Sequence, residues 1–182
     1  MRDLTNQFLT LLVRETHGAE IAESAAVLPL MFMILLGIFW FGQAFSLYGA
    51  ITRAAQEGAR AGAVPLCSTC SSAQSNNQFA TAAVNAVNAA LVASNLDPSK
   101  MQTTSKPPFS GCDNNLVTLN CPGSGAACVQ VPVQLLTAAQ GGGGCGISVS
   151  FQYPFKFWLP FASISNQQIL LTASARMRME TR

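Results

Sequence analysis

The six cysteines are the residues of this chain best suited to covalent or metal chemistry. All of them follow a long apolar stretch, and they are Cys67, Cys70, Cys112, Cys121, Cys128 and Cys145. The first two form a CxxC, a spacing found in zinc sites and in redox motifs. A structural zinc site usually needs a second close pair or histidines, and the only histidine, His17, precedes the apolar stretch. No βαβ pattern surrounds the CxxC, as a thioredoxin-like motif would require. An even number of cysteines on one side of a membrane span therefore favours disulfides in an oxidising compartment over a metal site.

The connectivity of three disulfides does not follow from the sequence alone. We predict one of the roughly 15 possible pairings, in which the last bridge joins the two arms of a hairpin with a glycine-rich tip. The suggested bridges are Cys67–Cys70, Cys112–Cys121 and Cys128–Cys145.

Other catalytic groups are scarce after the apolar stretch. The carboxylates there are Glu57, Asp97, Asp113 and Glu180, and no histidine accompanies them. A cysteine hydrolase would therefore lack its base. There is no G-x-S-x-G or H-E-x-x-H motif, and the glycine run 141–144 lacks the Lys-Ser/Thr of a phosphate-binding loop. The sequence predicts a protein that is not an enzyme and that holds no metal or cofactor.

The composition excludes another class of function. Only 10% of the 182 residues are charged, the net charge is +2, and no cluster of Lys and Arg precedes the last residues. Binding of nucleic acid through a basic patch is therefore not expected. The length leaves room for one domain of ordinary size besides the apolar stretch.

The apolar stretch carries no formal charge between Glu23 and Arg53. At about 1.5 Å per residue, a helix of that length exceeds the ~30 Å hydrocarbon thickness of a bilayer. Backbone polar groups in lipid must pair within their own segment, and Pro29 falls near the start, where a missing amide donor costs least. The sequence predicts one membrane-spanning helix that continues as a polar stalk and ends at Pro65.

Small residues follow one face of the predicted stalk, and such residues let helices approach closely, which suits bundling. This face consists of Tyr48, Ile51, Ala55, Ala59 and Gly62.

The remainder of the chain alternates between one helical pattern and several strand patterns. A helix is predicted over 78–96, with Phe79, Ala83, Val87 and Leu91 on its buried face and a stop at 97–98. Strands are predicted over 116–119, 128–136, 147–153 and 168–179, and Pro132 favours an edge position for the second. The class is α+β: a long N-terminal helix, a second helix and an antiparallel sheet of three or four strands. The aromatic segment 151–161 is interpreted either as core or, because of its prolines, as partly an exposed loop.

Glu23 is costly at the start of an apolar helix, because insertion scales assign comparable charges roughly +2.5 to +3.5 kcal/mol at the helix centre. It either reaches the aqueous interface or finds a partner. Gly18, four intervening residues, Glu23 and then an uncharged apolar run resemble the processing site of type IV pilin precursors. The resemblance implies that a prepilin peptidase cuts after Gly18 and makes Ala19 the new amino terminus. It also implies that Glu23 pairs with the terminal amine of a neighbouring subunit.

A second motif narrows the resemblance. Gln56-Glu57-Gly58-Ala59-Arg60 is similar to the R-E-G-A-R signature of TadE-like pseudopilins of the tight-adherence pilus, with Gln56 in place of the usual arginine. Segments 147–155 and 169–180 also resemble that family. From the residues alone, the exposed part of this motif is interpreted either as a solvated stalk or as a specific contact.

The resemblance implies a pilin-like division of the chain: a cleavable leader over 1–18, a transmembrane and stalk helix over 19–64, and an exported disulfide-bonded domain over 65–182. It implies a structural or minor pilus subunit whose partners are the prepilin peptidase, the inner membrane and other pilin subunits. The C-terminal domain would be extracytoplasmic and later reach a cell-surface pilus. The alternative is a single-span envelope protein whose disulfide-bonded domain binds another partner.

Overall fold

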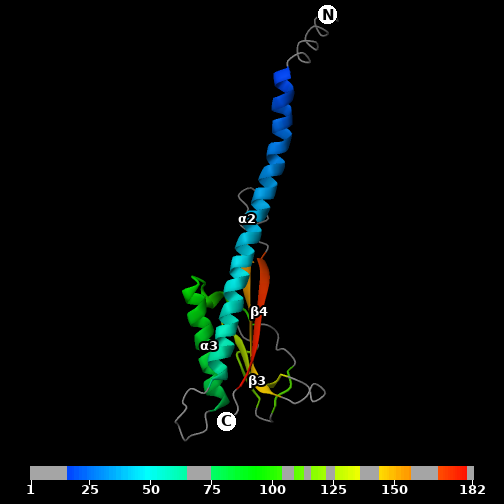
Figure 1. Cartoon of the computed structure of the whole chain (residues 1–182). Helices are drawn as coiled ribbons and strands as arrows, with labels where there is room; N and C mark the ends of the chain where they lie inside the picture. The colour runs from blue at the N-terminus through cyan, green and yellow to red at the C-terminus, as the bar shows by residue number, and fades with distance from the viewer. Residues whose placement is uncertain are drawn as a thin grey trace, which may run out of the picture. The chain divides into compact units, whose positions relative to one another are not determined.

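The computed structural model describes residues 16–64, 75–103, 109–112, 116–121, 126–135, 144–156 and 168–179. The chain divides into two compact units, Met1–Gln43 and Ala44–Arg182, and helix α2 (Thr16–Ala63) contributes to both (Figure 1). The second unit also contains helix α3 (Asn76–Ala93) and the short 3-10 helix η1 (Pro98–Lys100). Its strands are β1 (Val117–Leu119), β2 (Cys128–Gln134), β3 (Cys145–Lys156) and β4 (Gln168–Arg178). This architecture confirms the predicted α+β class.

The four strands form one antiparallel sheet in the order β1-β2-β3-β4. Its longest ladder joins β3 to β4, from Gly146 opposite Arg178 to Lys156 opposite Gln168. Alternation along β3 places Ile147, Val149 and Phe151 on one face of the sheet, where all three are fully buried. The strand predicted over 147–153 is therefore confirmed, as part of the longer β3.

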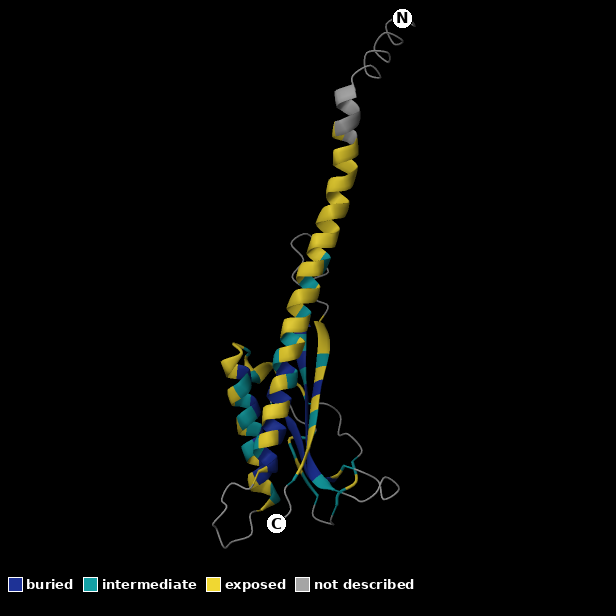
Figure 2. Ribbon diagram, viewed as in Figure 1, coloured by how far each residue is buried: buried dark blue, intermediate teal, exposed yellow. Residues whose placement is uncertain are grey.

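The core of the second unit lies between this face of the sheet and two helical segments (Figure 2). Helix α3 packs against β1 and β2, and its predicted buried face of Phe79, Ala83, Val87 and Leu91 is confirmed. Of the aromatic segment, Phe151, Tyr153 and Phe155 are buried, which supports the core interpretation as far as residue 156. The rest of that segment, over 157–161, lies outside the described residues.

Helix α3 ends earlier than predicted because Asn95, and not Asp97, supplies the stop. Asn95 adopts a left-handed backbone conformation with φ 56°. The N–H of Leu96 donates to the carbonyl of Leu91 at 2.9 Å, and the N–H of Asn95 to that of Val92 at 3.0 Å. These two bonds are the pattern of a Schellman cap, in which Asn is the usual substitute for Gly. Asp97 caps η1 instead, by accepting from the N–H of Ser99 at 3.0 Å.

The prediction that Pro132 places its strand at an edge is wrong, since β2 pairs with β1 on one side and with β3 on the other. The β2–β3 register shifts between Gln130 and Val133, so that Pro132 has no partner in that ladder. A bulge of this kind accommodates a residue that lacks an N–H donor. The carbonyl of Pro132 accepts from the N–H of Cys112 at 3.2 Å.

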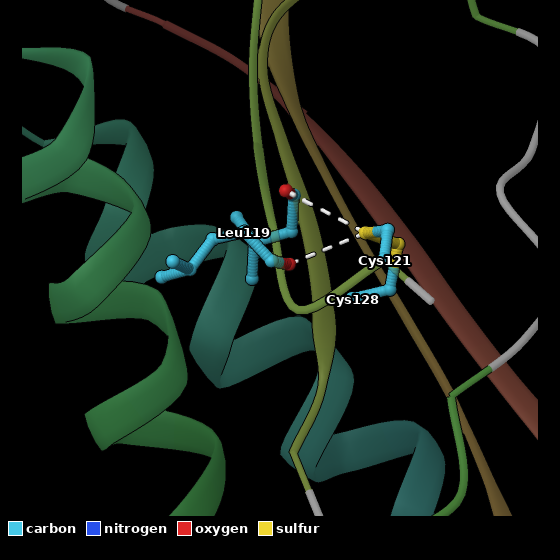
Figure 3. Close-up of a disulfide and its surroundings, with 4 residues drawn as sticks. Leu119, Cys121 and Cys128 are labelled. Carbon is cyan, nitrogen blue, oxygen red and sulfur yellow. Dashed lines mark hydrogen bonds between the residues drawn. A yellow bond between two sulfur atoms is a disulfide. The ribbon is translucent and has the colours of Figure 1, made fainter. Parts of the chain in front are cut away.

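Two disulfides lie within the described residues. Cys121, which follows β1, is bonded to Cys128 at the start of β2, with a Cα–Cα distance of 4.9 Å. The sulfur of Cys121 lies 3.2 Å from the carbonyl oxygen of Leu119 (Figure 3). Cys112 is bonded to Cys145 at the start of β3, with a Cα–Cα distance of 5.8 Å. These bridges fasten the β1–β2 connection and join the segment 109–112 to the sheet.

The predicted bridges Cys112–Cys121 and Cys128–Cys145 are therefore wrong, and the sheet register explains why. Antiparallel pairing places Cys128 opposite Ser150, five residues along β3 from Cys145. At ~3.4 Å per residue this separation is roughly 17 Å, whereas a disulfide needs Cα atoms closer than about 7 Å. The third predicted bridge, Cys67–Cys70, lies outside the described residues.

Peptide mapping of the unreduced chain should recover Cys112 linked to Cys145 and Cys121 linked to Cys128. In the chain-entropy account, a bridge that closes a longer loop stabilises more. Replacing Cys112 and Cys145 by Ala should therefore cost roughly 1 kcal/mol more than the same change at Cys121 and Cys128, within the usual ~2–5 kcal/mol. The free energy of unfolding, measured by urea titration in detergent micelles, compares the two double variants. A peptide containing Cys128 linked to Cys145 would contradict the sheet register itself.

Candidate functional site

The N-terminal part of α2 carries an unusually apolar surface. Over residues 21–45 most of its large apolar side chains are exposed, with Met33 77% and Phe45 70% accessible (Figure 2). Over Glu23–Ala63 the helix is long enough, and in its most apolar window apolar enough, to cross a membrane. Exposed apolar surface of this extent marks contact with lipid or with other protein.

Glu23 lies on this surface. Its side chain is exposed, and Val27 and Met31 follow it at intervals of four residues on the same side of α2. Among the described residues, Ser24 and Leu28 line a hollow together with these three. A formal negative charge therefore borders an apolar helix face without an ion pair to any residue that the structure describes. The backbone of Gly18 and Ala19 is helical, and their side-chain environments lie outside the description.

The motif Gln56-Glu57-Gly58-Ala59-Arg60 is divided between two sides of α2. Gly58 and Ala59 are buried, whereas Gln56, Glu57 and Arg60 are exposed. This chain departs from the family signature at Gln56. Because Gln56 is exposed, packing in the core of the domain does not restrict the type of side chain there. The buried and exposed halves of the motif are subject to different physical constraints.

The buried half is a point of close approach between α2, α3 and β3. A Cβ atom at Gly58 would overlap the Cγ2 methyl of Val87 and lie 3.1 Å from the carbonyl oxygen of Ala83. Four residues further on, a Cβ at Gly62 would overlap Ile147 and lie 3.0 Å from the Cβ of Ala83. Ala83 therefore lies against both glycines, and no larger residue fits at either position without a shift of its neighbours.

The small-residue face predicted for the stalk is buried within the same chain. Ile51, Ala55 and Ala59 are fully buried members of the core, while Tyr48 is 48% exposed. Because α3 and β3 occupy this face, it is not available for packing against a neighbouring helix. The prediction that these small residues allow close packing is confirmed, but they pack against α3 and β3 of the same chain and not against a helix of another subunit. The spacing of Gly58 and Gly62, one helical turn apart, was the signal for such a contact.

Among the described residues, no group of three or more His, Cys, Asp or Glu side chains gathers as metal ligands would. The cysteines within the described residues are all bonded in the two disulfides. Two features of the described chain are open to contact with other molecules: the apolar surface of α2 and the exposed half of the motif.

Comparison with known protein families gives a match over part of the chain. The family model TadE, described as TadE-like protein, matches residues 18–60. This confirms the resemblance to TadE-like proteins over that segment, which begins at the predicted cut site and ends with the last residue of the motif. Membership of this family would make the chain a protein associated with the tight-adherence pilus. No curated protein and no solved structure matches the chain significantly.

Replacing Gly58 by Ala should destabilise the second unit, although Ala is the better helix former by about 1 kcal/mol. The added methyl group meets Val87 and the backbone of Ala83, and overpacking of this kind costs about 1–3 kcal/mol. Gly49 is the matched control, because a Cβ there meets nothing within 4 Å. Urea unfolding in micelles should give a lower midpoint for Gly58→Ala and an unchanged or higher one for Gly49→Ala. Equal midpoints would show that the close approach at Gly58 is not limiting.

Proposed function

Because residues 18–60 match a TadE-like protein, we propose that this chain is a pilin-like subunit, structural or minor, of a tight-adherence pilus. A prepilin peptidase removes residues 1–18, the mature chain begins at Ala19, and the subunit assembles through its apolar helix. Its role is structural, so it needs no catalytic group, metal or cofactor. The observation that carries the proposal is the exposed apolar surface of α2 within the matched segment.

The apolar surface of α2 supports this proposal because an aqueous environment would leave it solvated at a large cost in free energy. Before assembly, lipid of the inner membrane covers the surface. In the filament, the helices of neighbouring subunits replace the lipid. The core of the second unit does not include residues 21–43, so these contacts can be exchanged while that core stays intact.

In this proposal, Glu23 determines how neighbouring subunits align with one another in the filament. After the cut, the amine of Ala19 is a positive charge that a carboxylate in apolar surroundings would bind. The border position of Glu23 beside Val27 and Met31 keeps its carboxylate at the edge of the surface that neighbouring helices would cover. An ion pair between the carboxylate of one subunit and the terminal amine of another would relieve two unfavourable charges together.

The exposed half of the motif is open to the same neighbours. Glu57 and Arg60 are exposed beyond the apolar surface and take no part in the core. We assign the second unit to the extracytoplasmic side, where its disulfides persist. The final location is then the cell-surface pilus.

Leader removal should depend on the small residue at the cut site. Gly18→Leu should leave the chain at full length in cells that contain the prepilin peptidase, because a branched side chain crowds a site suited to glycine. N-terminal sequencing of the membrane fraction measures this. Ala19→Ser, a small change on the other side of the cut, is the control and should be processed. An Ala19 terminus in the Gly18→Leu variant would contradict the proposal and favour a single-span envelope protein.

Glu23→Gln should permit membrane insertion and processing and yet reduce incorporation into filaments. The amide keeps the size of the side chain but leaves the terminal amine of the neighbour without its counter-charge, and loss of one partner of a buried pair costs ~3–5 kcal/mol. Shearing of filaments and quantification of this subunit at equal membrane levels measures the effect.

Glu20→Gln is the control for charge alone, because it removes one carboxylate three residues away. This variant should assemble normally. Equal incorporation of the Glu23→Gln and wild-type chains would mean that Glu23 simply reaches the aqueous interface.

A further inference from the structure

A hollow of about 570 Å³ lies in the second unit where η1 meets the end of the β3–β4 ladder. Its size is within the usual range for sites that hold small molecules, about 300–1,000 Å³. The polar side chains that line it include Ser99, Lys100, Gln102, Lys156 and Gln168. Neither the predicted cut site nor the family motif contributes to it, so the proposed function does not use this hollow.

The backbone holds both walls of the hollow in place. On one side, Gln102 continues the sheet beyond β2 through two bonds with Gln152, N–H to O at 2.8 Å and 2.7 Å. On the other side, Lys156 is paired with Gln168 at the end of the β3–β4 ladder. Tyr153, between the walls, is 5% exposed, and its hydroxyl accepts from the N–H of Asp97 at 3.1 Å. The lining residues thus belong to one framework of main-chain hydrogen bonds.

The charge of the hollow is positive. Two of the three lysines of the chain, Lys100 and Lys156, line it, and no carboxylate belongs to its described lining. Asp97 lies next to the hollow, and its carboxylate accepts from the hydroxyl of Ser99 at 2.8 Å and from the N–H of Ser99 at 3.0 Å. These bonds hold the pKa of Asp97 below its ordinary value, and the charge of Lys100 adds to the effect. Asp97 therefore offsets Lys100 in part, while the ammonium of Lys156 has no ion pair among the described residues.

Along residues 99–102, no main-chain N–H group is left to bind a phosphate group. The N–H of Ser99 donates to Asp97, that of Lys100 to the carbonyl of Asp97 and that of Met101 to the carbonyl of Pro98. The N–H of Gln102 is used by Gln152. Phosphate sites usually combine several free N–H groups or arginine forks. Residues 99–102 offer no free N–H group, and the described residues that line the hollow include no arginine. A lysine ammonium group is a compact point charge, and two of them are enough to bind one carboxylate.

The remaining lining suits hydroxyl groups and a ring. The amides of Gln102 and Gln168 each offer donors and an acceptor, as a polyhydroxylated ligand requires. Pro154 supplies apolar surface against which the carbon face of a ring can lie. We infer that this hollow binds a carboxylate-bearing sugar of the uronic acid class, with its carboxylate between Lys100 and Lys156 and its hydroxyls at the two glutamines.

Glucuronate, titrated against the full chain in micelles of an uncharged detergent, tests the inference by ligand-observed NMR. Glucuronate should bind, and glucose, which lacks the charge, should bind at least about tenfold more weakly, as expected for the loss of a hydrogen bond to a charged group. Lys156→Gln should weaken glucuronate binding by a similar factor, and Lys156→Arg should retain it. Arg53→Gln is the control for net charge, because Arg53 is exposed on α2 and does not line the hollow.

Two further probes separate a sugar site from a general anion site. Inorganic phosphate and N-acetylglutamate amide should both bind more weakly than glucuronate, the first because residues 99–102 leave no main-chain donor free and the second because it brings no hydroxyls. Binding of either probe as tight as that of glucuronate would overturn the assignment to an acidic sugar. Equal affinities for glucuronate and glucose, or a Lys156→Gln chain that is folded by near-ultraviolet circular dichroism and binds glucuronate normally, would overturn the site itself.

Discussion

The close approach of α2 to α3 and β3 at Gly58 and Gly62 is the constraint on which the second unit depends. The backbone of α2 meets the backbone of α3 and side chains of β3 at this point, and Ala83 of α3 lies against both glycines. Packing in protein interiors is dense, so a single extra methyl group here must displace a neighbour. The buried half of the family motif is therefore explained by the fold of one chain, without reference to any partner.

Helix α2 thereby combines two different environments in one element. Its last part buries Ile51, Ala55 and Ala59 in the core of its own domain. Its first part exposes apolar side chains that no described part of the chain covers, and Glu23 stands beside them. In the proposed function, lipid and then neighbouring subunits cover this first part. Because the two environments involve different residues, assembly can exchange the contacts of one while the packing of the other persists.

The sequence was most informative where periodicity alone decides the structure. The buried face of α3 was predicted residue by residue, because Phe79 to Leu91 follow a helical period. The position of β3 was predicted because Ile147 to Phe151 follow a strand period. The match at residues 18–60 also confirmed a resemblance carried by Gly18, Glu23 and the later motif. These features are local, so one stretch of sequence contains all of the information they need.

The errors concern features that depend on register or on residues far apart in the chain. The cysteine pairing failed because the position of Cys128 opposite Ser150 is fixed by the whole β2–β3 ladder. Pro132 was misplaced because its bulge is not visible in its own residue type. Lys100 and Lys156 share one hollow only because Gln102 joins the sheet beside β3, and no local pattern indicates that.

The central claim is that this chain leaves the membrane as a processed subunit of a filament. An intact-mass measurement on the wild-type chain recovered from sheared filaments tests it most directly. The account predicts a chain that begins at Ala19 and is present in the filament fraction. A chain that retains residues 1–18 and is found only in the membrane fraction would contradict it.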